Sequence, residues 1–192
     1  MSSSLQGRAE LVARLRELNA LSVIAELDDA RAAEVAERVD ELARELRGPS
    51  AQQPWYFRPG AAPVETGDAW ALFNPVSPPL RMRVDGGRAT GTTVLGPEFG
   101  GPPKVVHGGY VAVLLDHALG IYLHGVGRSS LTAQLSVRYL APTPLGSRLT
   151  VEASHSEIDG TTTYAWATVS VEGRVTARAE GRFVLGRGKW RS

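Results

Sequence analysis

A glycine-rich segment that leads into an apolar stretch carries the residues best suited to chemistry. The run 99–110 reads Phe-Gly-Gly-Pro-Pro-Lys-Val-Val-His-Gly-Gly-Tyr and continues directly into Val111–Leu123. If that stretch is a helix, its first N–H groups lack intrahelical partners and its dipole adds partial positive charge there. Gly108 and Gly109 would let a ligand oxygen reach these N–H groups without meeting a Cβ. The junction therefore predicts a site for an anion, or for the oxyanion that forms from a carbonyl.

Asp116 is the carboxylate within this apolar stretch, and its sequence neighbours on both sides are mainly apolar. An isolated carboxylate on a largely apolar helix needs a partner or a chemical task. The alternative is that this helix face is simply solvated. Because a Gly-Gly helix start lies nearby, we favour a functional role for Asp116.

The spacing of these two features has a geometric consequence. Asp116 lies seven residues after Gly109, so both lie on one helix face but are separated by roughly 10 Å along the axis. Catalytic contacts need about 3 Å, so one small reacting group cannot touch both in one chain. If both act on the same carbon, the carboxylate must come from a second, antiparallel copy of the helix. The sequence therefore predicts a two-fold dimer with two equivalent sites.

Composition and missing motifs exclude several other classes of function. The 192-residue chain has no cysteine, which excludes a thiol nucleophile, a disulfide framework and thiolate-bound metals. It contains no G-x-x-x-x-G-K-[ST], G-x-G-x-x-G, H-E-x-x-H or G-x-S-x-G motif. A net charge of +1 gives no reason to expect nucleic acid. His117 and His124 share a helix face, but we expect both to be packed and hydrogen-bonded, and we expect no metal.

The first 48 residues predict a helical arm, since they are rich in Ala, Leu, Glu and Arg. Two stripes recur at helical spacing, Leu11, Leu15, Leu18 and Leu21, then Val35, Val39, Leu42 and Leu46. Each helix is expected to lay one face on its own domain or on a partner subunit. Residues 1–50 hold 7 Lys+Arg against 10 Asp+Glu, so the arm is acidic, unlike a membrane-surface helix. A proline-rich connector is expected over 49–67.

The rest of the chain predicts an α+β domain over 68–187, followed by a basic tail at 188–192. Thr132–Tyr139 alternates with period two, with Ala133, Leu135, Val137 and Tyr139 on the apolar face and Thr132 on the polar face. Turn signals follow at Asp159-Gly160 and Glu172-Gly173. The expected strands are 70–73, 80–84, 89–94, 132–139, 149–153, 162–171 and 175–185. A sheet of about six strands with one apolar helix against one face is the fold class that results.

Two segments together make the chain resemble a known family. His107-Gly108-Gly109 is followed by Asp116 and Gly120, and then by the run 131–146, Leu-Thr-Ala-Gln-Leu-Ser-Val-Arg-Tyr-Leu-Ala-Pro-Thr-Pro-Leu-Gly. This combination is similar to the hotdog-fold acyl-CoA thioesterases, most closely to the HGG, PaaI-like group, over about residues 68–187. The resemblance implies a curved antiparallel sheet wrapped around a central helix. It also implies edge-to-edge dimers, often paired into tetramers.

The resemblance further implies hydrolysis of an acyl thioester at the dimer interface. By that likeness Asp116 is the catalytic carboxylate, as base or nucleophile, and Gly108 and Gly109 supply the amides that polarise the carbonyl. His107 helps hold that loop or the carbonyl, and Thr132 orients water or the carboxylate. Four residues fall where relatives contact coenzyme A: Arg138, Leu140, Thr161 and Thr162.

Many PaaI-like proteins carry a polar residue six positions before the histidine, where this chain has Gly101. The expected substrate is an acyl-CoA, without a further cofactor. The alternatives are a carrier-protein thioesterase, a non-catalytic acyl-thioester-binding module and, less favoured, a hydratase. No signal peptide is visible at the start of the sequence, and together with the missing cysteine this favours the cytoplasm, with no membrane partner.

Overall fold

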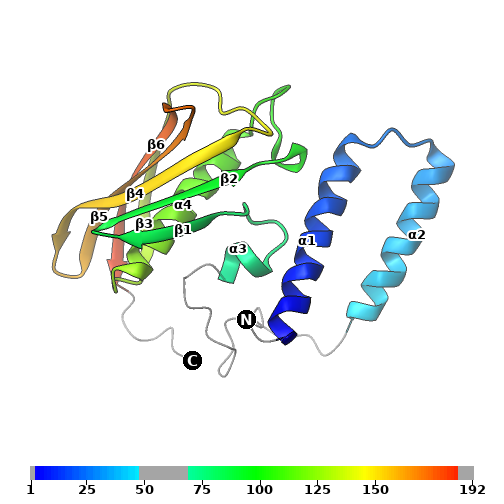
Figure 1. Cartoon of the computed structure of the whole chain (residues 1–192), viewed down its shortest axis with the longest axis horizontal. Coiled ribbons are helices and arrows are strands. Elements are labelled where there is room, and N and C mark those ends of the chain that lie inside the picture. The colour runs from blue at the N-terminus through cyan, green and yellow to red at the C-terminus, as the bar shows by residue number, and fades with distance from the viewer. Residues whose placement is uncertain (1–2, 48–68, 186–192) are drawn as a thin grey trace.

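A six-stranded antiparallel sheet with one helix across its inner face forms the body of the molecule (Figure 1). The computed structural model describes residues 3–47 and 69–185, so the predicted connector at 49–67 and the basic tail at 188–192 lie outside the described residues. The helices are α1 (Ser3–Ile24), α2 (Asp29–Leu46), α3 (Ala69–Phe73), the 3-10 turn η2 (Pro97–Phe99) and α4 (Gly108–Gly125). The strands are β1 (Arg81–Asp85), β2 (Arg88–Val94), β3 (Ser130–Tyr139), β4 (Arg148–Asp159), β5 (Thr162–Val171) and β6 (Arg174–Leu185).

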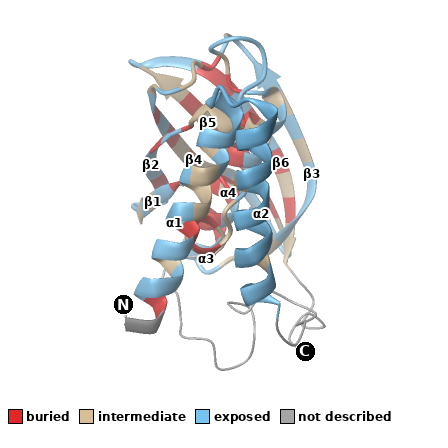
Figure 2. Cartoon of the chain, turned by 90° about the vertical axis from the view of Figure 1, so that its right-hand side faces the viewer, coloured by how far each residue is buried: buried red, intermediate tan, exposed pale blue. Residues whose placement is uncertain are grey.

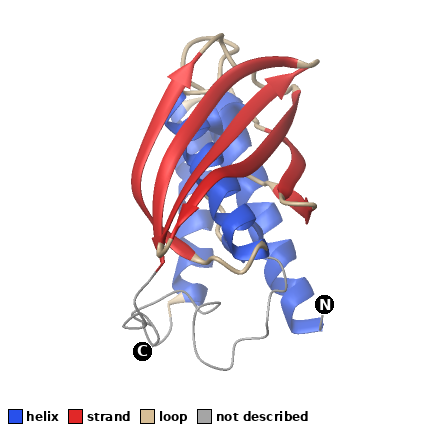
Figure 3. Ribbon diagram, turned by 90° about the vertical axis from the view of Figure 1, so that its left-hand side faces the viewer, coloured by secondary structure: helices blue, strands red, loops and turns tan. Residues whose placement is uncertain are grey.

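The sheet has the order β1-β2-β4-β5-β6-β3 and curves around α4 (Figure 3). β3 pairs with β6 on one side and with no described strand on the other, so it is an edge strand. The predicted α+β architecture, with a curved sheet of about six strands and one central helix, is confirmed. The predicted strand at 70–73 is wrong, because this segment forms the helical turn α3. Its residues Ala-Trp-Ala-Leu-Phe include good helix formers, and Asn74-Pro75 ends it.

The core lies between α4 and the concave face of the sheet. α4 buries an apolar face that includes Leu115, Ala118 and Tyr122. Opposite it, the central strands present small or branched residues: Val151, Ala153, Ala167, Val169, Ala177 and Ala179. Small side chains let the helix approach the sheet closely, so the sheet holds α4 in one position.

Among the described elements of the helical arm, α1 makes the main contacts with the body, because it packs against η2 and α3. Leu5 and Val12 are buried there, whereas Leu11 and Leu21 of the predicted stripe are 44% and 51% exposed. Leu15 and Leu18 of the stripe are half-buried, so the docked face overlaps the predicted one only in part. The docked face also carries a charged residue, Arg16, which a search for apolar periodicity passes over. None of the residues of α2, all of which the structure describes, is buried (Figure 2).

Within the described ranges, no helix combines the length and apolar character needed to cross a membrane.

Candidate active site

The helix start predicted to bind an oxyanion is fixed on both sides by backbone hydrogen bonds. The His107 N–H donates to the Phe99 carbonyl at 2.9 Å, and the Val106 N–H donates to the Thr143 carbonyl at 2.9 Å. His107 is the N-cap of α4, and its Nδ1 accepts a hydrogen bond from the Gly109 N–H at 3.0 Å. The loop and the first turn of α4 therefore form one ordered unit at the surface.

Gly108 and Gly109 were both predicted to donate an N–H to the substrate, but the His107 cap leaves only one of these two N–H groups without a hydrogen bond within the described chain. The Gly109 N–H is used by the His107 ring. The Gly108 N–H has no hydrogen-bond partner among the described residues, as expected for the first residue of a helix. Gly108 thus presents the available donor, and Gly109 becomes available only when the imidazole turns away.

Tyr139 covers the other side of the junction, a role that the sequence reasoning did not assign to it. Its hydroxyl donates to the Gly108 carbonyl at 2.8 Å. A Cβ at Gly108 would lie 3.3 Å from the Tyr139 ring, so the ring limits the space beside this residue. The signal that could have found it is an amphipathic ring at the end of an edge strand.

Gly101 fits its place for a steric reason. A Cβ at this position would come within 2.9 Å of the His107 Cα, so the polar side chain that many PaaI-like proteins carry there would displace His107. Lys104, in the same loop, has a φ of 65°. A lysine in the left-handed region stores backbone strain, and such strain is typical of functional loops.

Asp116 and Thr132 lie together, because the Thr132 Oγ1 donates to the Asp116 Oδ1 at 2.9 Å. The alternation of the sequence placed Thr132 on the outer, polar face of β3, and this prediction is wrong. A β-bulge between Thr132 and Gln134 places an extra residue, Ala133, so Thr132 pairs with the buried Phe183 and turns toward α4. The Asp116 Oδ2 has no hydrogen-bond partner among the described residues and is free to meet water or substrate.

The helix start and the carboxylate share one uncovered face of α4. Gly109, Val113 and Gly120 are exposed and Asp116 is half-buried along this face. Gly108 and Asp116 are both on it, but the rise of an α-helix separates them by roughly 12 Å. The described chain therefore presents two half-sites that one small group cannot touch together.

The four predicted coenzyme A contacts lie at two opposite ends of the sheet. Arg138 pairs with Arg178, and Leu140 is exposed just after β3. Thr161 and Thr162 lie at the turn between β4 and β5, next to the other end of β6. By their register on β6, at 176–178 and at 184–185, the two pairs lie six to nine residues apart, or roughly 20 to 30 Å. Within one chain these residues do not form one site.

The two histidines singled out in the sequence have separate surroundings. His117 packs edge-on against Trp70, with ring centroids 4.7 Å apart, and burial lowers its pKa to about 4. His124 Nδ1 is 2.8 Å from Ser129 Oγ. In the part of the chain that the structure describes, no group of three His, Cys, Asp or Glu residues could hold a metal ion. Sequence reasoning did not weigh His155, whose ring bonds to the buried Tyr122 hydroxyl.

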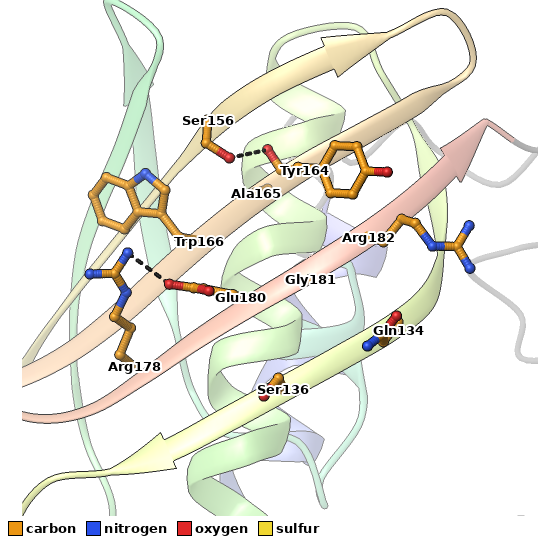
Figure 4. Close-up of a pocket in the computed structure, with 10 residues that line it drawn as sticks. All are labelled: Gln134, Ser136, Ser156, Tyr164, Ala165, Trp166, Arg178, Glu180, Gly181 and Arg182. Carbon is orange, nitrogen blue, oxygen red and sulfur yellow. Dashed lines mark hydrogen bonds and ion pairs between the residues drawn. The ribbon is translucent and has the colours of Figure 1, made fainter.

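A hollow of about 380 Å³ lies on the opposite, outer face of the sheet (Figure 4). Trp166 and Tyr164 of β5 and Arg178, Glu180 and Arg182 of β6 line it. It contains none of the predicted catalytic residues. The candidate catalytic residues Gly108 and Asp116 lie instead on the uncovered face of α4.

The fold has counterparts among known proteins. Residues 103–179 match the family model of the thioesterase superfamily. The acyl-coenzyme A thioesterase THEM4 of Xenopus laevis is 37% identical over 68 residues, which are 34% of this chain and 29% of that protein. The chain thus matches less than a third of that relative's length.

Two solved structures extend the comparison. RHA08564, a thioesterase superfamily protein, has a TM-score of 0.77 and 26% identity, with 92% of this chain and 94% of that chain covered. A hypothetical thioesterase of Streptococcus pneumoniae, crystallised with coenzyme A, has a TM-score of 0.53 and 22% identity, with 56% and 88% covered. The second likeness shows the fold alone. The match of residues 103–179 to the thioesterase superfamily and the fold shared with RHA08564 confirm the resemblance to the hotdog-fold thioesterases drawn from the sequence.

Proposed function

We propose that this protein is an acyl-CoA thioesterase whose two active sites lie at the interface of a homodimer. The observation that carries the proposal is the Thr132–Asp116 hydrogen bond of 2.9 Å on the same uncovered helix face as the Gly108 N–H. A thioesterase needs an oxyanion donor and a carboxylate on opposite sides of one carbonyl carbon. The family match and the names of the relatives support the same chemistry.

The dimer is proposed to form through β3, the edge strand. Antiparallel pairing of β3 with its copy joins two sheets and places the two α4 helices side by side in opposite directions. The uncovered face of one helix then meets that of the other. The same symmetry brings Arg138 and Leu140 of one protomer to the end of the sheet that carries Thr161 and Thr162 of the partner subunit. The two separated pairs would then complete one coenzyme A site.

In the proposed reaction, the Gly108 N–H of one protomer binds the thioester carbonyl oxygen. Asp116 from the other protomer removes a proton from water. In the alternative route its carboxylate bonds to the carbonyl carbon as the C–S bond breaks, and water then cleaves this anhydride, which releases the acid, restores the carboxylate and supplies the proton for the thiolate. In the base route the water oxygen bonds to the acyl carbon, the C–S bond breaks, and the proton passes to the departing coenzyme A thiolate. Thr132 holds the Oδ1 of Asp116 and leaves Oδ2 for this work. The reaction requires no cofactor other than the substrate's own coenzyme A.

The experiment is hydrolysis of a panel of aliphatic and aromatic acyl-CoAs, read by release of the free thiol. Asp116→Asn should remove turnover, and Asp85→Asn, at an exposed turn, is the matched control. Turnover by the Asp116 variant on every substrate that the unchanged protein hydrolyses would contradict the proposal. So would binding of acyl-CoA without hydrolysis, which is the result for a non-catalytic module. Activity restricted to acyl carrier protein would identify the carrier-protein alternative.

The shared site has its own test by complementation. Gly108→Pro removes the open N–H. Proline is well tolerated at the first helical position, and its Cβ requires the Tyr139 ring, 3.3 Å away, to move by a few tenths of an ångström. The backbone of His107, at φ −60° and ψ 133°, already suits a residue before proline. Mixing inactive Asp116→Asn with inactive Gly108→Pro protein, after subunit exchange, should restore about a quarter of the activity, since half the dimers then hold one intact site. No recovery despite proven exchange would place both groups in one chain.

A further inference from the structure

The helical arm reaches the active-site loop through one charged side chain, Arg16. α1 packs against α3 and η2, and Figure 1 shows α1 on the side of the body that carries α3. The Nη2 of Arg16 donates to three oxygens of the segment at 71–77: the carbonyls of Ala71 and Asn74, the latter at 2.9 Å, and the Ser77 Oγ at 3.2 Å. One side chain thus ties the arm to the segment that enters the sheet.

Arg16 also lies near Glu98 of η2, which is its electrostatic partner. Burial lowers the pKa of Arg16, and the attraction of Glu98 opposes this shift. The Arg16 Nε and the Glu98 Oε2 are both buried and have no hydrogen-bond partner among the described residues. Arg16 and Glu98 are both half-buried, and removing either charge removes the attraction between them.

Glu98 is joined to the active-site loop by the next residue. The Phe99 carbonyl accepts the His107 N–H at 2.9 Å, and the Phe99 ring packs edge-on against Tyr110 in the first turn of α4, with centroids 5.0 Å apart. His107 in turn caps α4 through the Gly109 N–H. Contacts therefore run from α1, which Arg16 anchors, through η2 to the helix start.

We infer that Arg16 is a positioning residue that fixes the active-site loop through Glu98 and Phe99, so the arm is part of the catalytic machinery's support. This inference rests on the proposed function for its effect on rate, but not for its effect on the loop. The match to RHA08564 covers 92% of this chain, so it must include most of the arm. The arm is thus a shared part of that architecture, not an unrelated extension.

The test compares Arg16→Met with Arg14→Met in the full chain. Both changes remove a guanidinium from α1, but Arg14 is exposed and pairs with Glu10 and Glu17 of the same helix. Hydrogen exchange at the His107 amide should become about tenfold faster in the Arg16 variant, because its bond to Phe99 opens more often. In the Arg14 variant the exchange rate should stay unchanged. This readout needs no substrate, so it holds even if the proposed function fails.

Kinetics provide the second readout. Arg16→Met should lower kcat about tenfold with little change in KM, because a misplaced donor affects the transition state more than binding. Glu98→Gln should act in the same direction, and the double variant should be no worse than either single one. If Arg16→Met fails to fold, the exchange rate of the His107 amide in Glu98→Gln tests the inference by itself. Unchanged His107 exchange in a folded Arg16 or Glu98 variant would overturn the inference.

Discussion

The hydroxyl of Thr132 on β3 donates to the carboxylate of Asp116 on α4, at 2.9 Å. This bond joins an edge strand to the central helix, and it selects which carboxylate oxygen stays free. It exists because the bulge after Thr132 turns that side chain from the outer face of the sheet to the inner face. A one-residue irregularity of the strand therefore determines the geometry of the proposed base.

Replacing Thr132 with valine is expected to lower kcat roughly 10- to 100-fold, since the carboxylate loses its orienting donor but keeps its charge. Thr132→Ser should retain most activity because its hydroxyl can make the same bond. Steady-state hydrolysis of the best acyl-CoA found in the panel measures both. Thr168→Val, on the outer face of β5, is the control. Equal rates for the serine and valine variants would show that the hydroxyl has no orienting role.

The strands and the central helix could be predicted because their signals are local. Period-two alternation marks β5 and β6, Glu172-Gly173 marks the turn between them, and the apolar run after Gly109 marks α4. Each of these elements forms where the sequence indicated. The candidate pair of helix start and carboxylate was also visible, since it needs only residue types and helical spacing.

The remaining features depend on contacts between distant segments. The bulge at Ala133 has no sequence signal, because Ala is compatible with either face of a strand. Arg16 docks α1 by satisfying carbonyls more than fifty residues away, which apolar periodicity cannot show. The hydrogen bond from the Gly109 N–H to the His107 ring, which takes this donor away from a substrate, depends on the rotamer of His107. These contacts required the tertiary structure.

Replacing Glu172 with asparagine is expected to stabilise the protein by about 1 kcal/mol, since Glu172 and Gly173 both have positive φ. Asparagine tolerates the left-handed region better than glutamate at this two-residue hairpin. Urea unfolding measures the change. Glu172→Ala is the matched control, because it removes the same charge without relieving the backbone. An equal gain in the alanine variant would assign the effect to charge.

Replacing His107 with alanine is expected to destabilise the protein by about 1 kcal/mol, because α4 loses its side-chain N-cap. His107→Asn should recover most of this stability, since asparagine is among the best N-cap residues. Urea unfolding of the three proteins at pH 7 gives the comparison. Identical stability of the alanine and asparagine variants would mean that the bond to the Gly109 N–H contributes nothing.

His117 predicts how stability depends on pH. Burial lowers its pKa to about 4 in the folded protein, from 6.5 in the unfolded chain. Between these two values the unfolded chain binds more protons, so the free energy of unfolding falls as the pH falls from 6.5 toward 4 and changes no further below 4. From pH 7 to pH 4.5 the loss from this group is roughly 2.5 kcal/mol.

The variant that isolates this effect is His117→Phe, which keeps a ring against Trp70 and cannot titrate. Its buried position favours the substitution, since the His117 Nε2 has no hydrogen-bond partner among the described residues. Urea unfolding at pH 7 and pH 4.5 should show a smaller loss of stability in the variant than in the unchanged protein, because the carboxylates titrate in both. Parallel losses would mean that His117 is protonated in the folded state at pH 4.5. Its ring would then have to reach water past Trp70, which contradicts the packing of the two rings at 4.7 Å.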